Sequence, residues 1–479
     1  MFYRPTRRVA TLRASNLFHT FDCGAGNKKR HALRQWRVIY LSGMADIRKT
    51  YFLICSISQM VMTARRRAIC RNPTRTGGQG GNMKRMNAAV LRTIALCASV
   101  AAAGQAVADV TELPQEIQDK LYNPALLDPN QPIADSAYRD FVAKNPPPWK
   151  IGYASSYAGN TWRAGVMDRL QNEIIPKWQK LGLISEVIVT QSNLNDSTQI
   201  QQMRQLVDQG VDAIIVCCSN PTALNQTVEY AHSKGVPVFS GIGYLTSPYA
   251  VNSSANFVVG GRMMGDWMAK EIGGKGNVLV VEGIPGASAS DSQNVGIQAA
   301  LAEHPDIAIK GQVAGMWTDQ VAQAEVQKWM ATNPGELNGI IIQSASELGA
   351  LRAMKQSGRD MVPITIGSEL GALCYWRHNP DFISSALHAW PPGDDFEMIW
   401  DIMMRTLEGQ GPKIQSILTT PIMMTKDQMM AAIPEDCSED SDGWYHPGIE
   451  AWAGTAYLDN FFLRPADPEA YDPASHPKP

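Results

Sequence analysis

The chain has 479 residues, of which 44% are hydrophobic and 18% are charged, with 8 cysteines and a formal net charge of −2. This composition excludes a disordered chain, which would be less hydrophobic and more charged, and a collagen-like or low-complexity chain, in which glycine and proline would dominate. On the usual prior of roughly 150 residues per domain, the length suggests about three domains with sizeable buried cores.

The near-zero charge is an average over two unlike parts. Residues 1–82 contain 16 Lys and Arg side chains but only two acidic residues, Asp22 and Asp46, so the rest of the chain is acidic. A basic segment of this kind can be an arm that binds nucleic acid or a membrane. The alternative is that residues 1–82 lie outside the working protein, as an N-terminal extension produced by a misassigned translation start.

A secretory signal peptide at residues 83–108 favours the second interpretation. A short basic stretch that begins at Met83 leads into the apolar run 93–103, and an A-x-A cleavage site ends at Ala108. The apolar run is too short to span a membrane as a mature helix. Because export signals are N-terminal, we predict that translation starts at Met83 or Met86 and that the signal peptide is cleaved after Ala108.

The predicted mature chain is acidic and exported. Removing residues 1–108 leaves 371 residues with 24 Lys and Arg against 43 Asp and Glu, a balance poorly suited to binding nucleic acid. Export leads to an oxidising compartment, in which cysteines can form disulfides. Cys217 and Cys218 are adjacent and cannot easily bridge to each other, whereas Cys374 and Cys437 are a plausible pair; the alternative is that these two are buried thiols.

Proline-rich sequence opens the mature chain. Residues 109–148 read as a polar extension with short helices, ended by a stiff linker of three prolines. A regular alternation of short apolar strands and amphipathic helices begins at Trp149. In this first half we expect strands at 150–155, 184–190, 211–216 and 235–239, and helices at 162–181, 198–209 and 221–234.

The same rhythm restarts after Asn256. Helices are predicted at 257–272, 289–303, 319–332, 346–357 and 394–408, and strands at 277–281, 307–313, 339–342, 364–367, 382–386 and 421–424. Short apolar strands separated by helices indicate parallel sheets covered on both faces. The expected fold class is therefore α/β, with two similar Rossmann-like lobes and a ligand cleft between the carboxyl ends of their sheets, as in periplasmic binding proteins of type I.

The domain boundaries follow from this rhythm. We assign residues 149–256 with about 390–420 to lobe 1, and residues 257–389 with about 421–430 to lobe 2. Hinges are expected near Asn256, Trp390 and Thr420, where the chain passes between the lobes. Residues 431–479 remain as a C-terminal extension.

No set of residues suited to catalysis emerges from the sequence. It lacks a G-x-G-x-x-G after the first strand, a P-loop, an H-E-x-x-H motif and a C-x-x-C pair, and residues 367–371 lack the spacing of a nucleophile elbow. The methionine-rich stretches 398–404 and 423–430 are typical of core packing rather than of a metal site. We therefore expect a protein that is not an enzyme and has no cofactor and no metal.

Four motifs carry a family resemblance. In chain order they are GVDAIIV at 210–216, GVPV at 235–238, GGR and GD within 260–266, and ELGALRAM at 347–354. Together they resemble the type I periplasmic solute-binding proteins of sugar ABC transporters, in the ribose-binding branch, over about residues 149–424. The resemblance implies an exported receptor that closes two lobes on a small polar ligand and presents it to a membrane permease. Repressors of the LacI type share this fold but begin with a DNA-binding helix-turn-helix, where this chain has a signal peptide.

The resemblance also implies ligand-binding residues. In sugar-binding members, aromatic faces sandwich the sugar ring and planar polar side chains meet its hydroxyl groups, because C–H faces stack on π surfaces and desolvated hydroxyls need hydrogen-bond partners. The residues that match by position are Ser156 and Asn160 as polar contacts, Trp162 and Trp317 as aromatic walls, and Glu369 where ribose binders have Asp.

Three further candidate positions depart from the ribose-binding pattern. Arg163 replaces a second aromatic residue, Asp291 stands where an Arg grips the sugar, and Ser344 replaces an Asn. Because a site built around one pattern of hydroxyl groups discriminates strongly against another, these departures argue against ribose itself. They favour a different sugar or polyol, with a sugar acid held by Arg163 as the second choice.

Several of these candidates also have simpler explanations. Trp162 and Trp317 could be core residues, Arg163 could be a solvated surface charge, and Asp291 could cap the helix that begins near it.

The predicted function is that of the exported substrate-binding component of an ABC importer, located in the periplasm. It would capture a sugar or polyol between two lobes and deliver it to a membrane permease. We expect a monomer that binds no nucleic acid. The alternative among binding proteins is a receptor for chemotaxis or for a sugar-like signal, and the alternative from another class is a sugar-acting enzyme.

Overall fold

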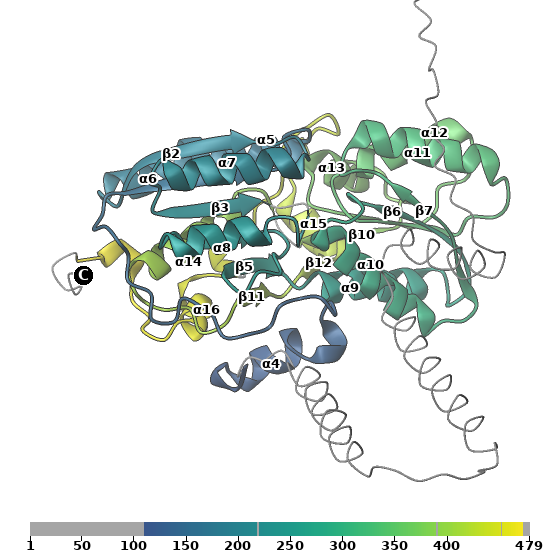
Figure 1. Cartoon of the computed structure of the whole chain (residues 1–479). Helices are drawn as coiled ribbons and strands as arrows, with labels where there is room; N and C mark the ends of the chain where they lie inside the picture. Colours follow the sequence, from purple (N-terminus) through teal and green to yellow (C-terminus); the bar gives the residue numbers. More distant parts are fainter. Residues whose placement is uncertain (1–109, 218–219, 389–390, 452, 473–479) are drawn as a thin grey trace, which may run out of the picture. The chain divides into compact units, whose positions relative to one another are not determined.

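The computed structural model describes residues 110–472 except for 218–219, 389–390 and 452. The predicted signal peptide and the basic segment before it lie outside these residues. Within the described part of the chain, no helix is long and apolar enough to cross a membrane. Two six-stranded sheets, one in each lobe, organise this part (Figure 1).

The sheet of lobe 1 has the strand order β11-β5-β4-β3-β1-β2, and its pairings are all parallel. Its strands are β1 (Trp149–Ser155), β2 (Ile184–Gln191), β3 (Ala213–Cys217), β4 (Val238–Gly241), β5 (Ala250–Ala255) and β11 (Ser416–Thr419). The accompanying helices are α5 (Thr161–Arg169), α6 (Ile175–Lys180), α7 (Asp196–Asp208), α8 (Asn225–Ser233) and α14 (Asp394–Leu407). A single π-helical turn, Leu170–Ile174, joins α5 to α6.

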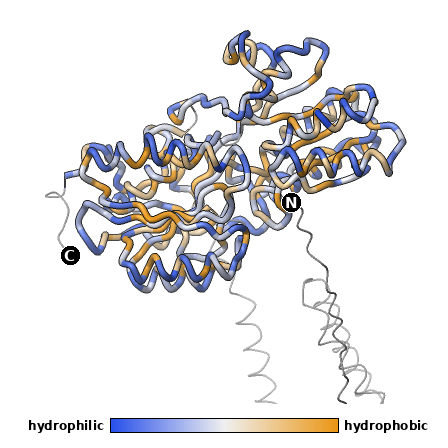
Figure 2. Tube along the Cα trace, turned by 90° about the horizontal axis from the view of Figure 1, so that it is seen from above, coloured by the Kyte–Doolittle hydropathy of each residue, from blue (hydrophilic) through white to orange (hydrophobic). Residues whose placement is uncertain are grey.

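Both faces of this sheet are buried. Ile214 and Ile215 are consecutive in β3, so their side chains point to opposite faces. Ile215 belongs to the cluster that contains Phe396 of α14, whereas Ile214 belongs to the cluster that contains Leu206 of α7. Figure 2 shows the result as hydrophobic strands in the interior of the lobe and hydrophilic segments on its outside. The continuous apolar runs of the sequence therefore become strands that are covered by helices on both faces.

The sheet of lobe 2 has the order β12-β10-β9-β8-β6-β7, in which β12 pairs antiparallel with β10 and the other pairings are parallel. Its strands are β6 (Gly276–Glu282), β7 (Ile307–Ala314), β8 (Gly339–Ile342), β9 (Ile364–Ile366), β10 (Ser384–His388) and β12 (Ile422–Met424). Its helices are α9 (Phe257–Glu271), α10 (Ser288–Ala302), α11 (Asp319–Thr332), α12 (Glu347–Ser357), α13 (Leu370–His378) and α15 (Lys426–Ala432). The predicted class, α/β with two similar lobes, is confirmed.

The glycine motif at 260–265 serves the packing of α9 against α10. A Cβ atom on Gly261 would overlap the backbone carbonyl of Gln293, and one on Gly296 would overlap the carbonyl of Val258. Glycine at both positions lets the two helix backbones approach more closely than any other residue would allow. This contact fixes the first turns of α10, which face the other lobe.

The N-terminal extension is hydrogen-bonded to one of the segments through which the chain passes from lobe 1 to lobe 2. It contains α4 (Gln115–Leu121) and two short 3-10 turns, as expected for a polar extension with short helices. The side-chain amide of Asn256, between β5 and α9, donates to the carbonyl oxygens of Leu121 at 3.0 Å and Leu126 at 2.9 Å. The chain also passes between the lobes from β10 to α14 and from β11 to β12.

Of the two alternatives that the sequence leaves open for Cys374 and Cys437, the structure shows the disulfide. Cys374 in α13 is bonded to Cys437, with the two Cα atoms 5.8 Å apart. The bond ties the chain that follows α15 to lobe 2. Cys217, at the end of β3, is a buried free thiol.

Candidate functional site

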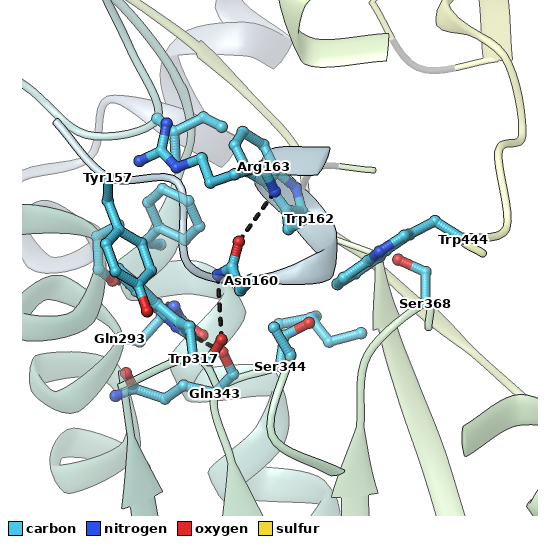
Figure 3. A pocket seen from close by; sticks show the side chains of 15 residues that line it. Tyr157, Asn160, Trp162, Arg163, Gln293, Trp317, Gln343, Ser344, Ser368 and Trp444 are labelled. Atoms are coloured by element: carbon cyan, nitrogen blue, oxygen red, sulfur yellow. Dashed lines mark hydrogen bonds between the residues drawn. The ribbon is translucent and has the colours of Figure 1, made fainter. Parts of the chain in front are cut away.

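A cavity lies where the carboxyl ends of the two sheets meet, and it holds about 700 Å³ of space, part of it open to solvent (Figure 3). Its aromatic residues are Tyr157, Trp162, Phe257, Trp317 and Trp444. Its polar residues are Asn160, Arg163, Gln293, Gln343, Ser344 and Ser368, and the remaining lining is Ile242, Ala289, Ala345 and Leu387.

The structure brings five of the eight candidate residues to this cavity. These are Asn160, Trp162, Arg163, Trp317 and Ser344. Ser156, Asp291 and Glu369 do not line it. Each of these three stands one or two positions from a residue that does line the cavity. Side chains one or two positions apart point in different directions at the end of a strand and on a helix.

The first turn of α5 supplies the wall from lobe 1. Asn160 is the N-cap of α5, and its side-chain oxygen accepts from the N–H of Arg163 at 2.9 Å. Its side-chain amide donates to the carbonyl oxygen of Trp317, in lobe 2, at 3.0 Å. Trp162 is half-buried and rests against Phe396, with ring centroids 6.4 Å apart. The cap therefore sets where the Trp162 ring enters the cavity and also joins the lobes.

Arg163 is held against lobe 1 and is not a solvated surface charge. Its guanidinium lies 5.0 Å from the centroid of the Trp162 ring. Burial lowers the pKa of Arg163, but the attraction and hydrogen bonds of Cys217 and Tyr153 outweigh burial and raise the pKa overall. Burial also raises the pKa of the neighbouring Asp395 well above its usual range. Arg163 therefore stays a cation at the edge of the cavity.

Trp317 supplies the aromatic wall from lobe 2 through an unusual backbone. Its φ angle is +50°, in the left-handed region, and its indole N–H donates to the carbonyl oxygen of Gln343 at 3.0 Å. A Cβ atom on Gly283 would overlap the Trp317 ring, so the ring lies directly on the backbone of the loop that follows β6. The position of this ring is therefore fixed by three separate segments.

Left-handed backbone at non-glycine residues gathers around the cavity. Ile242 has a φ of +57°, Ser344 of +68° and Ala345 of +53°, and all three line the cavity together with Trp317. Such conformations cost free energy and persist only where the surrounding structure determines them. Their concentration at one place is typical of a preorganised binding site.

The amide of Gln343 shapes the cavity wall. Its oxygen accepts from the N–H of Gly283 at 2.9 Å and from the hydroxyl of Ser290 at 2.7 Å. Its nitrogen donates to the carbonyl of Ser290 at 3.1 Å and to the side chain of Asn294 at 2.7 Å. Because all the hydrogen-bonding positions of this amide are used within the protein, Gln343 joins the end of β8 to the loop after β6 and to α10.

Ser156 and Asp291 point away from the cavity. Ser156 is buried, and its carbonyl accepts from the N–H of Leu194 at 2.6 Å, while the next residue, Tyr157, lines the cavity. Asp291 lies in α10 between Ala289 and Gln293, which both face the cavity. At about 100° per residue, a side chain two positions from both faces the opposite side. Asp291 is exposed, and its carboxylate accepts from the N–H of Gly286, in the loop before α10, at 3.1 Å; the N-cap of α10 is Ala287, and no side chain caps this helix, so the capping alternative is wrong.

Glu369 lies beneath the cavity and joins the lobes. Its carboxyl accepts from the hydroxyl of Thr161, in α5, at 3.0 Å. Burial, followed by the nearby charges of Glu347 and Asp319, raises its pKa. Burial likewise raises the pKa of Glu347. The raised pKa favours a protonated Glu369, which fits a carboxyl that is 3% exposed and has no cation among its named neighbours.

The lobes are in contact at the cavity. The hydroxyl groups of Tyr157 and Thr318 lie 3.2 Å apart, which adds to the bonds of Asn160 and Thr161 described above. All three contacts start from residues 157–161 of lobe 1. The arrangement is therefore a closed one, in which a ligand would touch both lobes.

Several cavity residues have no counterpart among the sequence-based candidates. Tyr157, Gln293 and Ser368, which line the cavity, stand one or two positions from Ser156, Asp291 and Glu369 in the sequence. Trp444 comes from the C-terminal extension, beyond the part of the chain that resembles the family. Within the described residues, no group of three or more His, Cys, Asp or Glu side chains is arranged to hold a metal ion.

Two α/β lobes with a cavity between the carboxyl ends of their sheets are an architecture in which a ligand can bind between the lobes. The chain belongs to the family described as the periplasmic binding protein domain, whose model matches residues 151–409. The family predicted from the sequence motifs is therefore confirmed, and it is a family of binding proteins.

Relatives and solved structures agree with this assignment. The chain is 34% identical over 181 residues to the xylitol-binding protein of Mycolicibacterium smegmatis. The match covers 37% of this chain and 52% of that protein, so the chain spans about half the length of this relative. It is 26% identical over 216 residues to the ribose import binding protein of Escherichia coli, covering 45% and 70% of the two chains. An ABC transporter solute-binding protein from Actinobacillus succinogenes with bound D-allose has a TM-score of 0.51 at 20% identity, covers 59% and 99% of the two chains, and shows the fold alone.

Proposed function

We propose that this chain is the exported substrate-binding component of an ABC importer, which captures a sugar or polyol in the periplasm and delivers it to a membrane permease without chemistry. The observation that carries the proposal is the cavity between the lobes, to which lobe 1 contributes Trp162 and lobe 2 contributes Trp317. Asn160, Ser344 and Ser368 add neutral polar groups to the same walls (Figure 3).

The chemistry of these walls suits a neutral ligand with many hydroxyl groups. Aromatic faces accept the C–H surface of a sugar or an extended polyol. Hydroxyl and amide side chains can both donate and accept, as the hydroxyl groups of the ligand do. The similarity to a xylitol-binding protein makes a pentitol the first ligand to test.

A sugar acid is the second candidate, because Arg163 lines the cavity. One guanidinium nitrogen of Arg163, Nη1, is buried and makes no hydrogen bond to any described residue. A carboxylate ligand would give this nitrogen a charge-assisted hydrogen bond.

A thermal-shift screen of the purified mature chain tests the proposal. The panel contains xylitol, ribitol, hexitols, aldopentoses, aldohexoses and the corresponding sugar acids. A ligand that binds the folded state alone stabilises it by about 2.7 kcal/mol at a concentration one hundred times its Kd. Calorimetry on the best compound then gives the affinity. If no polyol, sugar or sugar acid raises the melting temperature, the proposed ligand class is wrong.

Export is tested separately by sequencing the N-terminus of the protein recovered from the periplasm. Cleavage after Ala108 gives a mature chain that begins at Asp109. A first residue upstream of Met83 would contradict both the signal peptide and the proposed translation start.

A further inference from the structure

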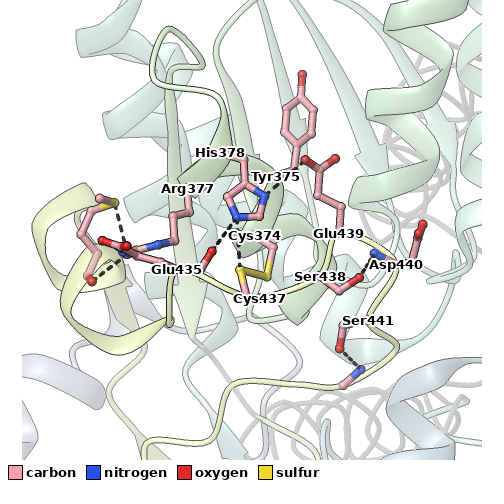
Figure 4. Close-up of a disulfide and its surroundings, with 12 residues drawn as sticks. Cys374, Tyr375, Arg377, His378, Glu435, Cys437, Ser438, Glu439, Asp440 and Ser441 are labelled. Atoms are coloured by element: carbon pink, nitrogen blue, oxygen red, sulfur yellow. Dashed lines mark hydrogen bonds and ion pairs between the residues drawn. A yellow bond between two sulfur atoms is a disulfide. The ribbon is translucent and has the colours of Figure 1, made fainter.

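The C-terminal extension is fastened to lobe 2 soon after α15. The disulfide between Cys374 and Cys437 joins it to α13 (Figure 4). The ring nitrogen Nε2 of His378, also in α13, lies 3.2 Å from the carbonyl oxygen of Glu435. Arg377 donates to the carbonyl oxygen of Met430 at 2.8 Å. After Cys437, the ring nitrogen Nδ1 of His378 lies 3.6 Å from the carboxylate of Glu439, so polar contacts accompany the covalent bond on both sides.

The next residues pair with the loop after β9, at the cavity. The N–H of Leu370 donates to the carbonyl oxygen of Gly443 at 2.8 Å, and the N–H of Tyr445 donates to the carbonyl oxygen of Ser368 at 2.8 Å. These bonds flank Trp444 on both sides. Its backbone is therefore held against lobe 2 as a short added strand would be.

Immediately afterwards the chain is fastened to lobe 1. The N–H of Gly448 donates to the carboxylate of Asp394, at the start of α14, at 3.1 Å, and His446 Nδ1 lies 3.5 Å from the other oxygen of this carboxylate. Further on, Phe461 and Phe462 are at most 1% exposed and belong to the hydrophobic core of lobe 1. The extension thus crosses from one lobe to the other at residues 445–448.

Trp444 stands at this crossing and faces the cavity beside Ser368 (Figure 3). Its side chain is 7% exposed. Its indole nitrogen is buried, and no described residue accepts a hydrogen bond from it. More than nine in ten buried donors in proteins are paired, so an unpaired one in a cavity wall points to an acceptor on the ligand. Trp317 differs, because its indole N–H already donates to Gln343.

We infer that residues 437–462 are a strap fixed on both lobes, and that Trp444 is a ligand-binding residue whose indole N–H donates to a hydroxyl oxygen of the bound sugar or polyol. The role of Trp444 rests on the proposed function. The family match ends at residue 409, so this wall of the cavity comes from a segment outside the matched domain. The strap closes the cavity with a third tryptophan and limits how far the lobes separate.

Two substitutions of Trp444 separate the hydrogen bond from the ring. Trp444→Phe keeps an aromatic face but removes the N–H, and the affinity for xylitol, or for the best compound of the thermal-shift panel, should fall about two- to tenfold. Trp444→Ala also removes the face and should cost more than about tenfold, mainly through faster dissociation in stopped-flow measurements. Trp329→Phe, a half-buried tryptophan of lobe 2 outside the cavity, is the matched control and should bind as the wild type does.

The strap itself is tested without any ligand. In the double variant Cys374→Ser/Cys437→Ser, hydrogen exchange at the amides of Leu370 and Tyr445 should accelerate at least about tenfold, while the amide of Ile215 in the core of lobe 1 keeps its protection. Small-angle scattering should show a larger radius of gyration, because the lobes are free to separate further.

The outcomes distinguish the parts of the inference. Folded Trp444→Phe and Trp444→Ala proteins that bind as tightly as the wild type would overturn the role of Trp444 and leave the proposed function intact. A wild-type protein that binds nothing in the panel would overturn the proposed function and, with it, the role of Trp444. Unchanged exchange at Leu370 and Tyr445 in the double variant would overturn the strap in either case.

Discussion

Trp162 and Trp317 reach the cavity from two lobes whose sheets share a strand order but differ in the direction of one edge strand, and the backbone holds the two rings by different means. Trp162 sits in the first turn of an ordinary helix that Asn160 caps, and its half-buried ring rests on Phe396. Trp317 sits in a left-handed conformation, with its ring against the backbone of Gly283 and its N–H bonded to Gln343.

Because of this difference, contact with the ligand can be changed without changing the local structure at Trp162 but not at Trp317. Removing the ring of Trp162 leaves the cap of α5 and its helical hydrogen bonds in place, so the lobe 1 wall can lose its aromatic face without moving. The ring of Trp317 is itself the partner of two other loops, so changes to those loops displace the wall. Substitutions at the Trp162 wall should therefore change mainly the affinity, whereas substitutions at the Trp317 wall should change affinity and stability together.

The largest effect should come from Trp162→Ala. Losing an aromatic face that stacks on the ligand should weaken binding about tenfold or more, with little loss of thermal stability. Calorimetry with the best ligand of the panel measures the affinity, and circular dichroism reports the fold. A variant that binds with unchanged affinity would remove Trp162 from the site.

Gly283→Ala should disturb the wall of lobe 2 without replacing any side chain of the cavity. The added methyl group overlaps the Trp317 ring, which must leave its position. Overpacking of this kind costs about 1–3 kcal/mol of stability, and we expect the affinity to fall about fivefold through the displaced ring. Gly335→Ala is the matched control, because nothing lies within 4 Å of a Cβ atom there. Equal affinities in the two variants would show that the position of Trp317 is unimportant.

The periodic parts of the fold are predictable from the sequence, and the polar strands are not. Runs such as residues 211–216 and 339–342 are apolar throughout, so they indicate buried strands. The strands β5 (AVNSSA) and β11 (SILT) lack such a run, because they carry polar side chains that are buried inside the protein. Asn252 of β5, for example, is bonded to Leu245 and to Ser416 of β11.

The site is predictable at the level of loops but not of register. Position alone suggested Ser156 and Glu369, whereas Tyr157 and Ser368 line the cavity, because a change of one residue at the end of a strand reverses the direction of the side chain. The left-handed conformations at Ile242 and Ser344 carry no sequence signal, since they arise from the surrounding loops. The sequence could not indicate that Trp444 lines the cavity, because only the tertiary structure brings the C-terminal extension there.

A smaller effect should appear in the pH dependence of the stability, through Glu369 of lobe 2. The raised pKa of Glu369 means that the folded state binds its proton more tightly than the unfolded state, so stability falls as the pH rises above the unfolded value of about 4.3. Glu369→Gln removes this dependence, and its melting temperature relative to the wild type should rise between pH 5 and pH 8, by on the order of 1 kcal/mol in stability. The exposed Glu271→Gln should show no such trend. A difference that is flat with pH would contradict a protonated Glu369 in the folded state.

The smallest effect should come from Asp291→Asn in lobe 2, although Asp291 replaces a sugar-gripping Arg by position. Asp291 is exposed on the face of α10 opposite Ala289 and Gln293, and Asn keeps the oxygen that accepts from Gly286. We therefore expect the affinity to stay within about twofold of the wild type and the stability to stay within about 0.5 kcal/mol. Asp291→Ala, which also loses the hydrogen bond to the N–H of Gly286, should cost about 0.5–1 kcal/mol of stability while binding equally well. A tenfold loss of affinity in both variants would instead place Asp291 on the ligand, and α10 would have to turn by about half a revolution to bring it there.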